Sequence, residues 1–212
     1  MTDRRKLAAE QPPKPSKWPR TTRRQDRIAH ALDKRQPDLT VVLENIHDRH
    51  NASAVLRSCD AVGVLRICLV YTFETPPETF ARTSSASAAK WIEIERYNSI
   101  SECYAALRAT GFAVYSTAFT GEARGLYELD FTVPTAVVFG NEMRGLSEEA
   151  VAFADETICI PMMGMVQSLN VSVACAVTLY EALRQRAAAG MYGASRLTAE
   201  TKESLADDWL LR

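Results

Sequence analysis

Residues 160–170 read IPMMGMVQSLN, and residues 171–177 continue as VSVACAV. The stretch begins as an apolar strand that ends at Pro161, a loop of Met and Gly follows, and Ser168 or Asn170 then stands where a helix N-cap belongs. Ligands in open α/β sheets bind where the carboxyl ends of strands meet loops and helix N-termini. This junction is therefore the first candidate site, although on this stretch alone a helix cap with no further role is the simpler interpretation.

Outward from this stretch, the chain alternates between strand-like and helix-like segments. We expect strands at residues 39–43, 66–71, 91–95, 112–116, 134–140 and 157–160, and helices at 23–35, 51–63, 84–89, 99–111, 170–189 and from Ser147 onward. Ser99, with Glu102 three residues later, forms a capping-box pattern. The alternation predicts an α/β fold with a mostly parallel sheet and helices on both faces.

The composition is that of a globular protein. With 212 residues and 47% hydrophobic side chains, the chain suits one domain of ordinary size with extensions. No apolar run approaches the roughly 20 residues that span a bilayer, and the first residues, MTDRRK, lack the apolar core of a signal peptide. We therefore expect a cytoplasmic protein that does not engage a membrane.

Several common kinds of site have no counterpart in the sequence. The five cysteines form no CxxC pair and lie mostly in apolar patterns, which predicts reduced core residues, and the three histidines lack zinc spacing, so we expect no metal. No GxGxxG follows the first strand, and there is no GxxxxGK[ST]. A GxSxG elbow is also missing. A dinucleotide or triphosphate cradle and Ser/His/Asp catalysis are therefore disfavoured.

The basic residues are concentrated at the N-terminus. Residues 1–35 hold eleven Lys or Arg against four Asp or Glu, a net charge of +7, whereas the remainder carries −8. A basic arm on an acidic body suggests a polyanionic partner, and nucleic acid is the natural candidate because Lys and Arg neutralise phosphates. Arg20, Arg23, Arg24 and Arg27 are the candidate RNA-binding residues. A solvated terminus with no partner is an equal alternative.

Three strand-to-loop junctions carry polar residues that core packing does not require. Residues 45–64 (NIHDRHNASAVLRSCDAVGV), 138–147 (VFGNEMRGLS) and 160–174 (IPMMGMVQSLNVSVA) resemble, in order, the three motifs of the SpoU class of RNA ribose methyltransferases. The resemblance covers about residues 23–195 and is closest to the tRNA-modifying TrmH subfamily, which residues 36–41, 180–186 and 189–192 also resemble.

The resemblance implies more about the fold than the residues alone could predict. It implies the SPOUT architecture, in which the C-terminal segment of the α/β domain forms a deep trefoil knot that binds S-adenosylmethionine and leaves S-adenosylhomocysteine as product. By motif, the cofactor site is expected to include Thr117, Gly140, Ile160, Ser168 and Leu169. Two subunits are expected to pair with composite active sites. We expect a basic arm and helix at 1–38, the knotted domain at 39–190 and a tail at 191–212.

The resemblance also assigns candidate catalytic residues. Arg57 matches the family's catalytic arginine, and Asn51, Glu142, Ser168 and Asn170 match the other polar positions. The alternatives are helix capping by the asparagines and Ser168, and a contact of Glu142 with a helix N-terminus or with Arg144. For Arg57 the alternative is a surface salt bridge. Because the pKa of arginine exceeds about 12, we favour electrostatic stabilisation of the ribose oxygen by Arg57 over a general-base role.

These residues lead to three hypotheses about function. The first is 2'-O-methylation of a ribose in tRNA, at guanosine 18 of the D-loop. The second is the same reaction on ribosomal RNA, which the short N-terminal segment disfavours because such relatives usually carry an additional RNA-binding domain. The third is an RNA-binding protein that retains the fold without catalysis, against which Arg57, Glu142 and Asn170 argue.

Overall fold

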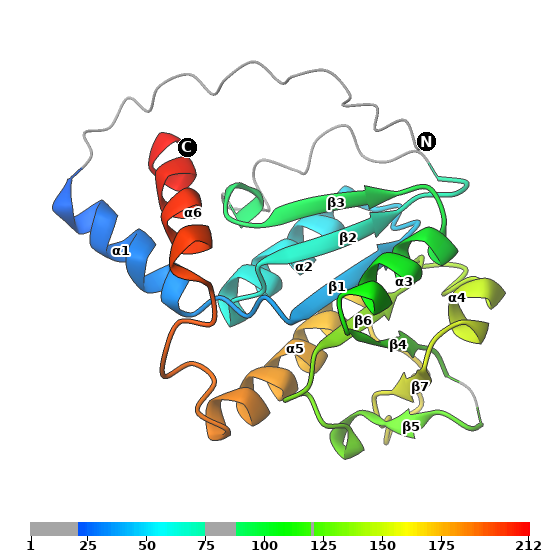
Figure 1. Ribbon diagram of the computed structural model, residues 1–212. Coiled ribbons are helices and arrows are strands. Elements are labelled where there is room, and N and C mark those ends of the chain that lie inside the picture. The colour runs from blue at the N-terminus through cyan, green and yellow to red at the C-terminus, as the bar shows by residue number, and fades with distance from the viewer. Residues whose placement is uncertain (1–20, 75–87, 120) are drawn as a thin grey trace.

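The computed structural model describes residues 21–74, 88–119 and 121–212. Over these ranges the chain forms a seven-stranded sheet in the order β3-β2-β1-β6-β4-β7-β5, and every pairing between strands is parallel (Figure 1). The strands are β1 (Leu39–Glu44), β2 (Arg66–Val70), β3 (Glu93–Tyr97), β4 (Ala113–Thr117), β5 (Arg124–Gly125), β6 (Thr135–Phe139) and β7 (Glu156–Cys159). The predicted parallel α/β sheet is confirmed.

Helices cover both faces of the sheet because its central strands are apolar on both sides. Along β1, Leu39, Val41 and Leu43 join a core with α2 (Arg49–Val62) and α5 (Val171–Ala188). Val42 points the other way, into a core with α3 (Ile100–Ala109) and α4 (Glu148–Ala152). Successive strand residues face opposite sides, so a continuous apolar strand requires a helical layer on each face.

The helix termini follow local side-chain chemistry. Ser99 caps α3, Ser147 caps α4 and Asn170 caps α5, each through its side-chain oxygen, which confirms the predicted starts of these helices. The second helix differs, because its N-cap is Asp48, three residues before the expected start at Asn51. Asn51 therefore does not cap the helix and lies in the first turn of α2.

Other differences concern short or weakly patterned segments. β3 begins two residues later than expected, and β5, a two-residue strand paired with β7, was not predicted. The helix expected at 84–89 falls largely outside the described residues, and Ala88–Lys90 form a single 3₁₀ turn. None of the described helices combines the length and the apolarity needed to cross a bilayer.

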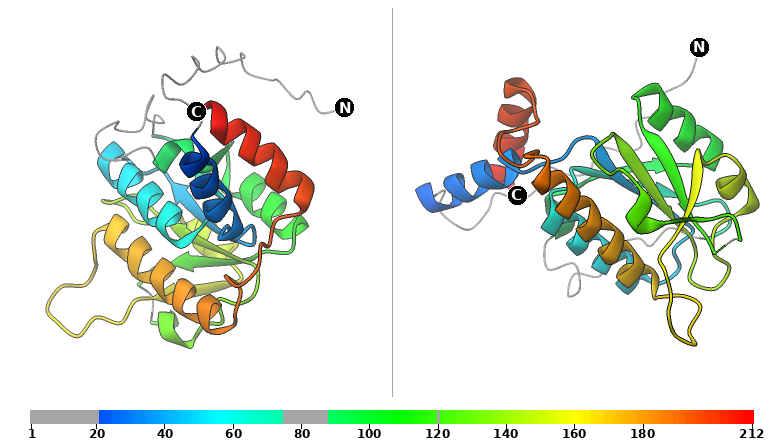
Figure 2. Two further views of the ribbon diagram at one scale, coloured as in Figure 1. Left: turned by 90° about the vertical axis from the view of Figure 1, so that its left-hand side faces the viewer. Right: turned by 90° about the horizontal axis from the view of Figure 1, so that it is seen from below.

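The two ends of the described chain pack against each other. α1 (Thr22–Asp33) confirms the predicted first helix, and α6 (Ala199–Leu211) lies beside it in both Figure 1 and Figure 2. Trp209 is buried between Trp91 and Arg35. The centroids of the two tryptophan rings are 5.2 Å apart, and the guanidinium carbon of Arg35 lies 5.0 Å from the centroid of the Trp209 ring. The predicted C-terminal tail thus contributes a helix to a small third core. The domain limits at residues 38 and 190 stay predictions, as does the knot.

Candidate functional site

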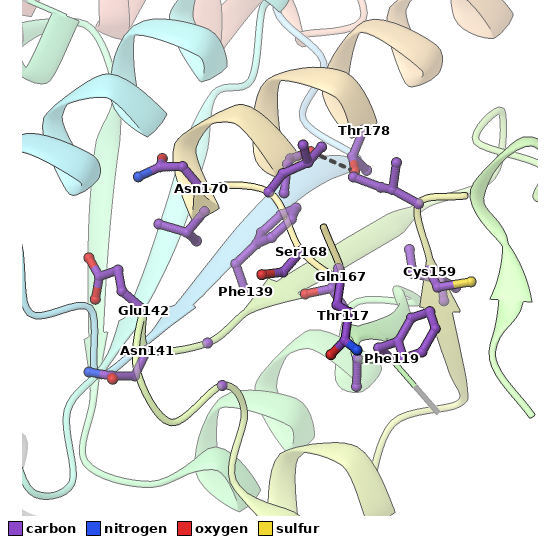
Figure 3. Close-up of a pocket in the computed structure, with 18 of the residues that line it drawn as sticks. Thr117, Phe119, Phe139, Asn141, Glu142, Cys159, Gln167, Ser168, Asn170 and Thr178 are labelled. Atoms are coloured by element: carbon purple, nitrogen blue, oxygen red, sulfur yellow. Dashed lines mark hydrogen bonds between the residues drawn. The ribbon is translucent and has the colours of Figure 1, made fainter. Parts of the chain in front are cut away.

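A pocket of about 860 Å³ opens at the carboxyl edge of the sheet. The ends of β4, β6 and β7 and the start of α5 surround it, so it lies at the junction around residues 160–170 (Figure 3). All five residues expected to hold the cofactor line this pocket: Thr117, Gly140, Ile160, Ser168 and Leu169. Glu142 and Asn170, expected to be catalytic, line it as well.

The walls combine apolar side chains with hydroxyl and amide groups. Phe139, Ile160 and Leu169 supply apolar surface, and Thr117 is fixed by the hydrogen bond that its hydroxyl donates to the Val138 carbonyl over 2.7 Å. Among the described lining residues only Glu142 and Arg144 are charged. Such a lining suits a nucleoside with few charges better than a nucleotide that carries several phosphates. The residues present therefore fit S-adenosylmethionine.

Gly140 is required by the path of the backbone around the pocket. The amide of Asn141 donates to the Gly145 carbonyl over 3.0 Å, and the amide of Gly145 donates back to the Asn141 carbonyl over 2.8 Å. This tight loop returns so close that a Cβ on Gly140 would lie 2.3 Å from the Gly145 carbonyl carbon. Only glycine allows this approach. Gly140 thus shapes the loop that carries Glu142.

Three residues from the three motifs form one hydrogen-bonded chain at the rim. Asn51 donates its side-chain amide to Glu142 Oε1 over 2.9 Å, and its carbonyl oxygen accepts from Asn170 Nδ2 over 3.1 Å. Asn170 Oδ1 accepts from the amide and the hydroxyl of Ser172, at 2.9 and 2.6 Å. Asn170 therefore caps α5 and orients Asn51 at the same time, so the capping and functional interpretations are compatible.

The environment of Glu142 keeps its carboxylate ionised. Partial burial by itself would raise its pKa, but hydrogen bonds from the Asn51 side chain, from its own amide and from the His47 and Asp48 amides lower the pKa below its ordinary value. The amide bonds from His47 and Asp48 measure 3.1 and 3.2 Å. These donors stabilise the charged form. Glu142 therefore holds the first turn of α2 against the 140–146 loop.

Arg57 lies apart from the pocket. It is an exposed residue of α2, six positions after Asn51, and neither Arg57 nor Asn51 is among the described residues that line the pocket. Asn51 is nevertheless connected to the lining through Glu142 and Asn170. The structure of one chain thus gathers four of the five expected catalytic residues at the pocket and its rim, and Arg57 is not among the residues that line it.

Three of the expected RNA-binding arginines, Arg23, Arg24 and Arg27, lie at the opposite edge of the sheet. Arg23 and Arg27 are exposed on α1, whereas Arg24 is half-buried and donates to the Trp209 carbonyl over 3.4 Å. Arg20 lies outside the described residues. α1 packs with Leu65, which precedes β2 at its amino end. A strand of five or six residues is roughly 20 Å long, so a ligand that reaches both α1 and the pocket must be large.

Two buried asparagines beside the site lie within the first two motifs, but the sequence analysis assigned no role to either. Asn45, at φ 51°, and Asn141 are both almost fully buried, and Asn141 Nδ2 donates to the Asn45 carbonyl over 2.7 Å. Glu44 is buried too and accepts from the amide and the hydroxyl of Ser147, at 2.9 and 2.6 Å. The signal was available, because Glu44 and Asn45 are polar residues that directly end a buried apolar strand.

The motifs and the geometry agree with the relatives of this chain. Residues 38–180 match the SpoU rRNA Methylase family. The chain is 52% identical over 191 residues to a tRNA (guanosine(18)-2'-O)-methyltransferase of Thermus thermophilus, in a match that covers 90% of this chain and 97% of that protein.

Solved structures of SpoU-type methyltransferases resemble this chain as well. The Aquifex aeolicus TrmH/SpoU tRNA modifying enzyme superposes with a TM-score of 0.84 at 39% identity, over 89% of this chain and 95% of that one. The SpoU methyltransferase AviRb from Streptomyces viridochromogenes, solved in complex with the cofactor AdoMet, gives a TM-score of 0.61 at 27% identity, over 74% of this chain and 62% of that one. From its motifs, its pocket and these relatives, the chain belongs to the SpoU rRNA methylase family.

Proposed function

We propose that this protein transfers a methyl group from S-adenosylmethionine to the ribose 2'-oxygen of guanosine 18 in tRNA. The observation that carries the proposal is the hydrogen-bonded chain Glu142–Asn51–Asn170, which joins the three motifs at the rim of the pocket. The name of the Thermus relative, 52% identical over nearly the whole chain, supports the substrate and the position. We assign the reaction to the cytoplasm.

In this proposal the pocket residues bind and orient the cofactor. Main-chain groups around Gly140, Ile160, Ser168 and Leu169 hold it, and Thr117 lies at the end of β4 beside them. When bound, the cofactor supplies a methyl group on a sulfonium, which is activated for attack by an oxygen nucleophile. The task of the chain is then to place a ribose hydroxyl in line with that methyl group.

We assign to Arg57 the stabilisation of the reacting ribose oxygen. A ribose hydroxyl is a poor nucleophile, and charge develops on its oxygen as the new bond forms, so a fixed guanidinium stabilises the transition state. Arginine side chains stay protonated in proteins, and the proton of the hydroxyl is therefore assigned to an RNA phosphate or to water. Asn51, Glu142, Ser168 and Asn170 act as positioning groups around it.

The position of Arg57 supports an active site shared between two copies of the chain. Arg57 lies outside the pocket lining on an exposed part of α2, and in this proposal the Arg57 of one copy reaches the cofactor that the other copy binds. The motif at 160–170 and α5 also expose apolar surface, at Met163, Met165, Val166, Val173 and Tyr180. Exposed apolar patches of this kind mark interaction surfaces. We infer a homodimer.

Methyl transfer from labelled S-adenosylmethionine to an unmodified tRNA transcript, with the modified nucleotide mapped, tests the proposal. The expected result is label on the ribose of guanosine 18 that is lost in Arg57→Ala. Ribosomal RNA is the second candidate, favoured by the description of the family. Label on ribosomal RNA alone would establish that substrate, and cofactor binding with no transfer to any RNA would indicate a non-catalytic RNA-binding protein.

A further inference from the structure

An arginine and an aromatic ring are paired on the surface beside the proposed active site. The guanidinium carbon of Arg144 lies over the ring of Phe73, 4.9 Å from its centroid. Phe73 follows β2 and is 52% exposed, and Arg144 follows β6 and is exposed as well. Neither residue belongs to a hydrophobic core of the described chain. An exposed pair of this kind contributes little to folding stability.

The backbone on both sides of this pair is nevertheless held rigidly. Asn45 Oδ1 accepts from the amides of Thr72 and Phe73, at 2.8 and 3.4 Å. Asn141 Oδ1 accepts in the same way from the amides of Met143 and Arg144, at 2.9 and 3.1 Å.

The two asparagines are bonded to each other, since Asn141 Nδ2 donates to the Asn45 carbonyl. Both are almost fully buried, and Asn45 adopts φ 51°, a left-handed conformation that asparagine tolerates better than most residues with a side chain. Two buried amides thus fix the backbone on both sides of an exposed arginine–aromatic pair.

The pair adjoins the groups assigned to the reaction. Arg144 lines the cofactor pocket, two residues after Glu142. On the other side, Glu74 follows Phe73 and lies 3.2 Å from His47 Nδ1, while the His47 amide donates to Glu142. Phe73 and Arg144 therefore lie at the edge of the pocket, within reach of an RNA strand whose ribose enters it.

We propose that Phe73 and Arg144 bind a nucleotide of the RNA substrate next to the target ribose, which extends the proposed function and rests on it. The exposed face of Phe73 stacks on an unpaired base, since base–aromatic stacking tolerates any base. The guanidinium of Arg144, held over the same ring, donates to a phosphate of that strand. The two buried asparagines keep both groups in place before RNA arrives.

Phe73→Ala is the decisive variant because Phe73 does not line the cofactor pocket. Loss of one base–aromatic stack predicts an affinity for tRNA that is lower by about 5- to 150-fold in Phe73→Ala. The KM for tRNA rises in parallel, while the affinity for S-adenosylmethionine and the melting temperature stay at wild-type values. Tyr127→Ala is the matched control, because Tyr127 is an aromatic residue, 60% exposed, outside the pocket lining.

Arg144→Ala and Arg144→Lys separate charge from planar stacking. Arg144→Ala should weaken tRNA binding and reduce its dependence on salt, and Arg144→Lys should restore the salt dependence without the full affinity. Unchanged tRNA affinity in Phe73→Ala would overturn the proposal. A loss of cofactor affinity in Arg144→Ala as large as the loss of tRNA affinity would also overturn it.

The binding measurement separates this proposal from the function itself. A wild-type protein that binds tRNA and transfers no methyl group overturns the proposed function, while Phe73→Ala still decides the stacking proposal by affinity. A wild-type protein that does not bind tRNA overturns both.

Discussion

Asn51 contacts Glu142 through its amide nitrogen, over 2.9 Å, and Asn170 through its amide oxygen, over 3.1 Å. One side chain on α2 thus fixes the loop after β6 and the start of α5 relative to each other. Both ends of its amide are used, so no residue that is only a donor or only an acceptor can replace it. This relationship makes Asn51 a positioning residue although it does not line the pocket.

We expect Asn51→Asp to lower kcat at least as much as Asn51→Ala. The aspartate loses the donor to Glu142 and places a like charge beside that carboxylate. We expect kcat to fall by about 10²-fold, the cost of misplacing reacting groups by about 1 Å, with little change in the melting temperature. Steady-state kinetics with Asn98→Ala as an exposed control checks this prediction. A variant with wild-type kcat would show that the link is structural.

Glu142 should make folding stability depend on pH in the acid range. Its pKa in the folded protein is below the ordinary value of about 4.3, in the net balance of burial and hydrogen bonds. The unfolded chain therefore binds the proton first as the pH falls. The contribution is complete above about pH 4.3 and is lost as the pH falls through the lower folded-state pKa.

Urea unfolding of wild type and Glu142→Gln between pH 7 and pH 3 measures this contribution. We expect wild type to be the more stable at pH 7 and the difference to shrink below about pH 4.3. A difference that is the same at every pH would mean that the carboxylate charge of Glu142 does not stabilise the fold.

Gly140→Ala should disturb the cofactor pocket. The added Cβ would meet backbone atoms of Gly145 and Leu146 at 2.3 to 2.5 Å, and backbone cannot move aside as a flexible side chain can. We expect a destabilisation of about 1–3 kcal/mol together with weaker binding of S-adenosylmethionine by calorimetry. Gly121→Ala is the control, because a Cβ there meets nothing within 4 Å and Gly121 does not line the pocket. Equal behaviour of the two variants would contradict this account of Gly140.

Trp209→Ala should loosen the small third core between α1 and α6. The indole is 2% exposed and packs on Trp91 and Arg35, so the expected destabilisation is about 3–5 kcal/mol. Leu211→Ala, on the same helix and 47% exposed, should change stability by less than about 0.5 kcal/mol. Chemical denaturation of both variants measures this, and a small loss for Trp209→Ala would mean that α6 is dispensable for folding.

Arg57→Lys tests the electrostatic role of the guanidinium. Lysine keeps the charge and loses the planar fork of donors, so we expect kcat to fall by roughly 10²-fold, the range for one lost stabilising donor. The affinity for S-adenosylmethionine should not change, because Arg57 does not line the pocket. A Lys variant that keeps most of its activity, with a pH profile set by the new amine, would favour a general-base mechanism.

Much of the fold could be read from local patterns. β1 and β6 are mostly apolar and are buried on both faces. The starts of α3, α4 and α5 depend on single side chains that bond to amides two or three residues away. These are short-range effects, which a sequence displays directly. β5 was missed because two residues carry no periodicity. Its pairing partner, β7, lies more than 30 residues along the chain.

The sequence by itself determined the parallel α/β sheet, the junction at residues 160–170 and, through three motifs, the family. Only the tertiary structure decided how the polar residues meet. Asn51 lies 91 residues from Glu142 and 119 from Asn170, and their contact depends on β1 and β6 being neighbours with α5 packed on α2. Local propensity cannot encode such contacts, because they arise from the burial of distant apolar segments against one another.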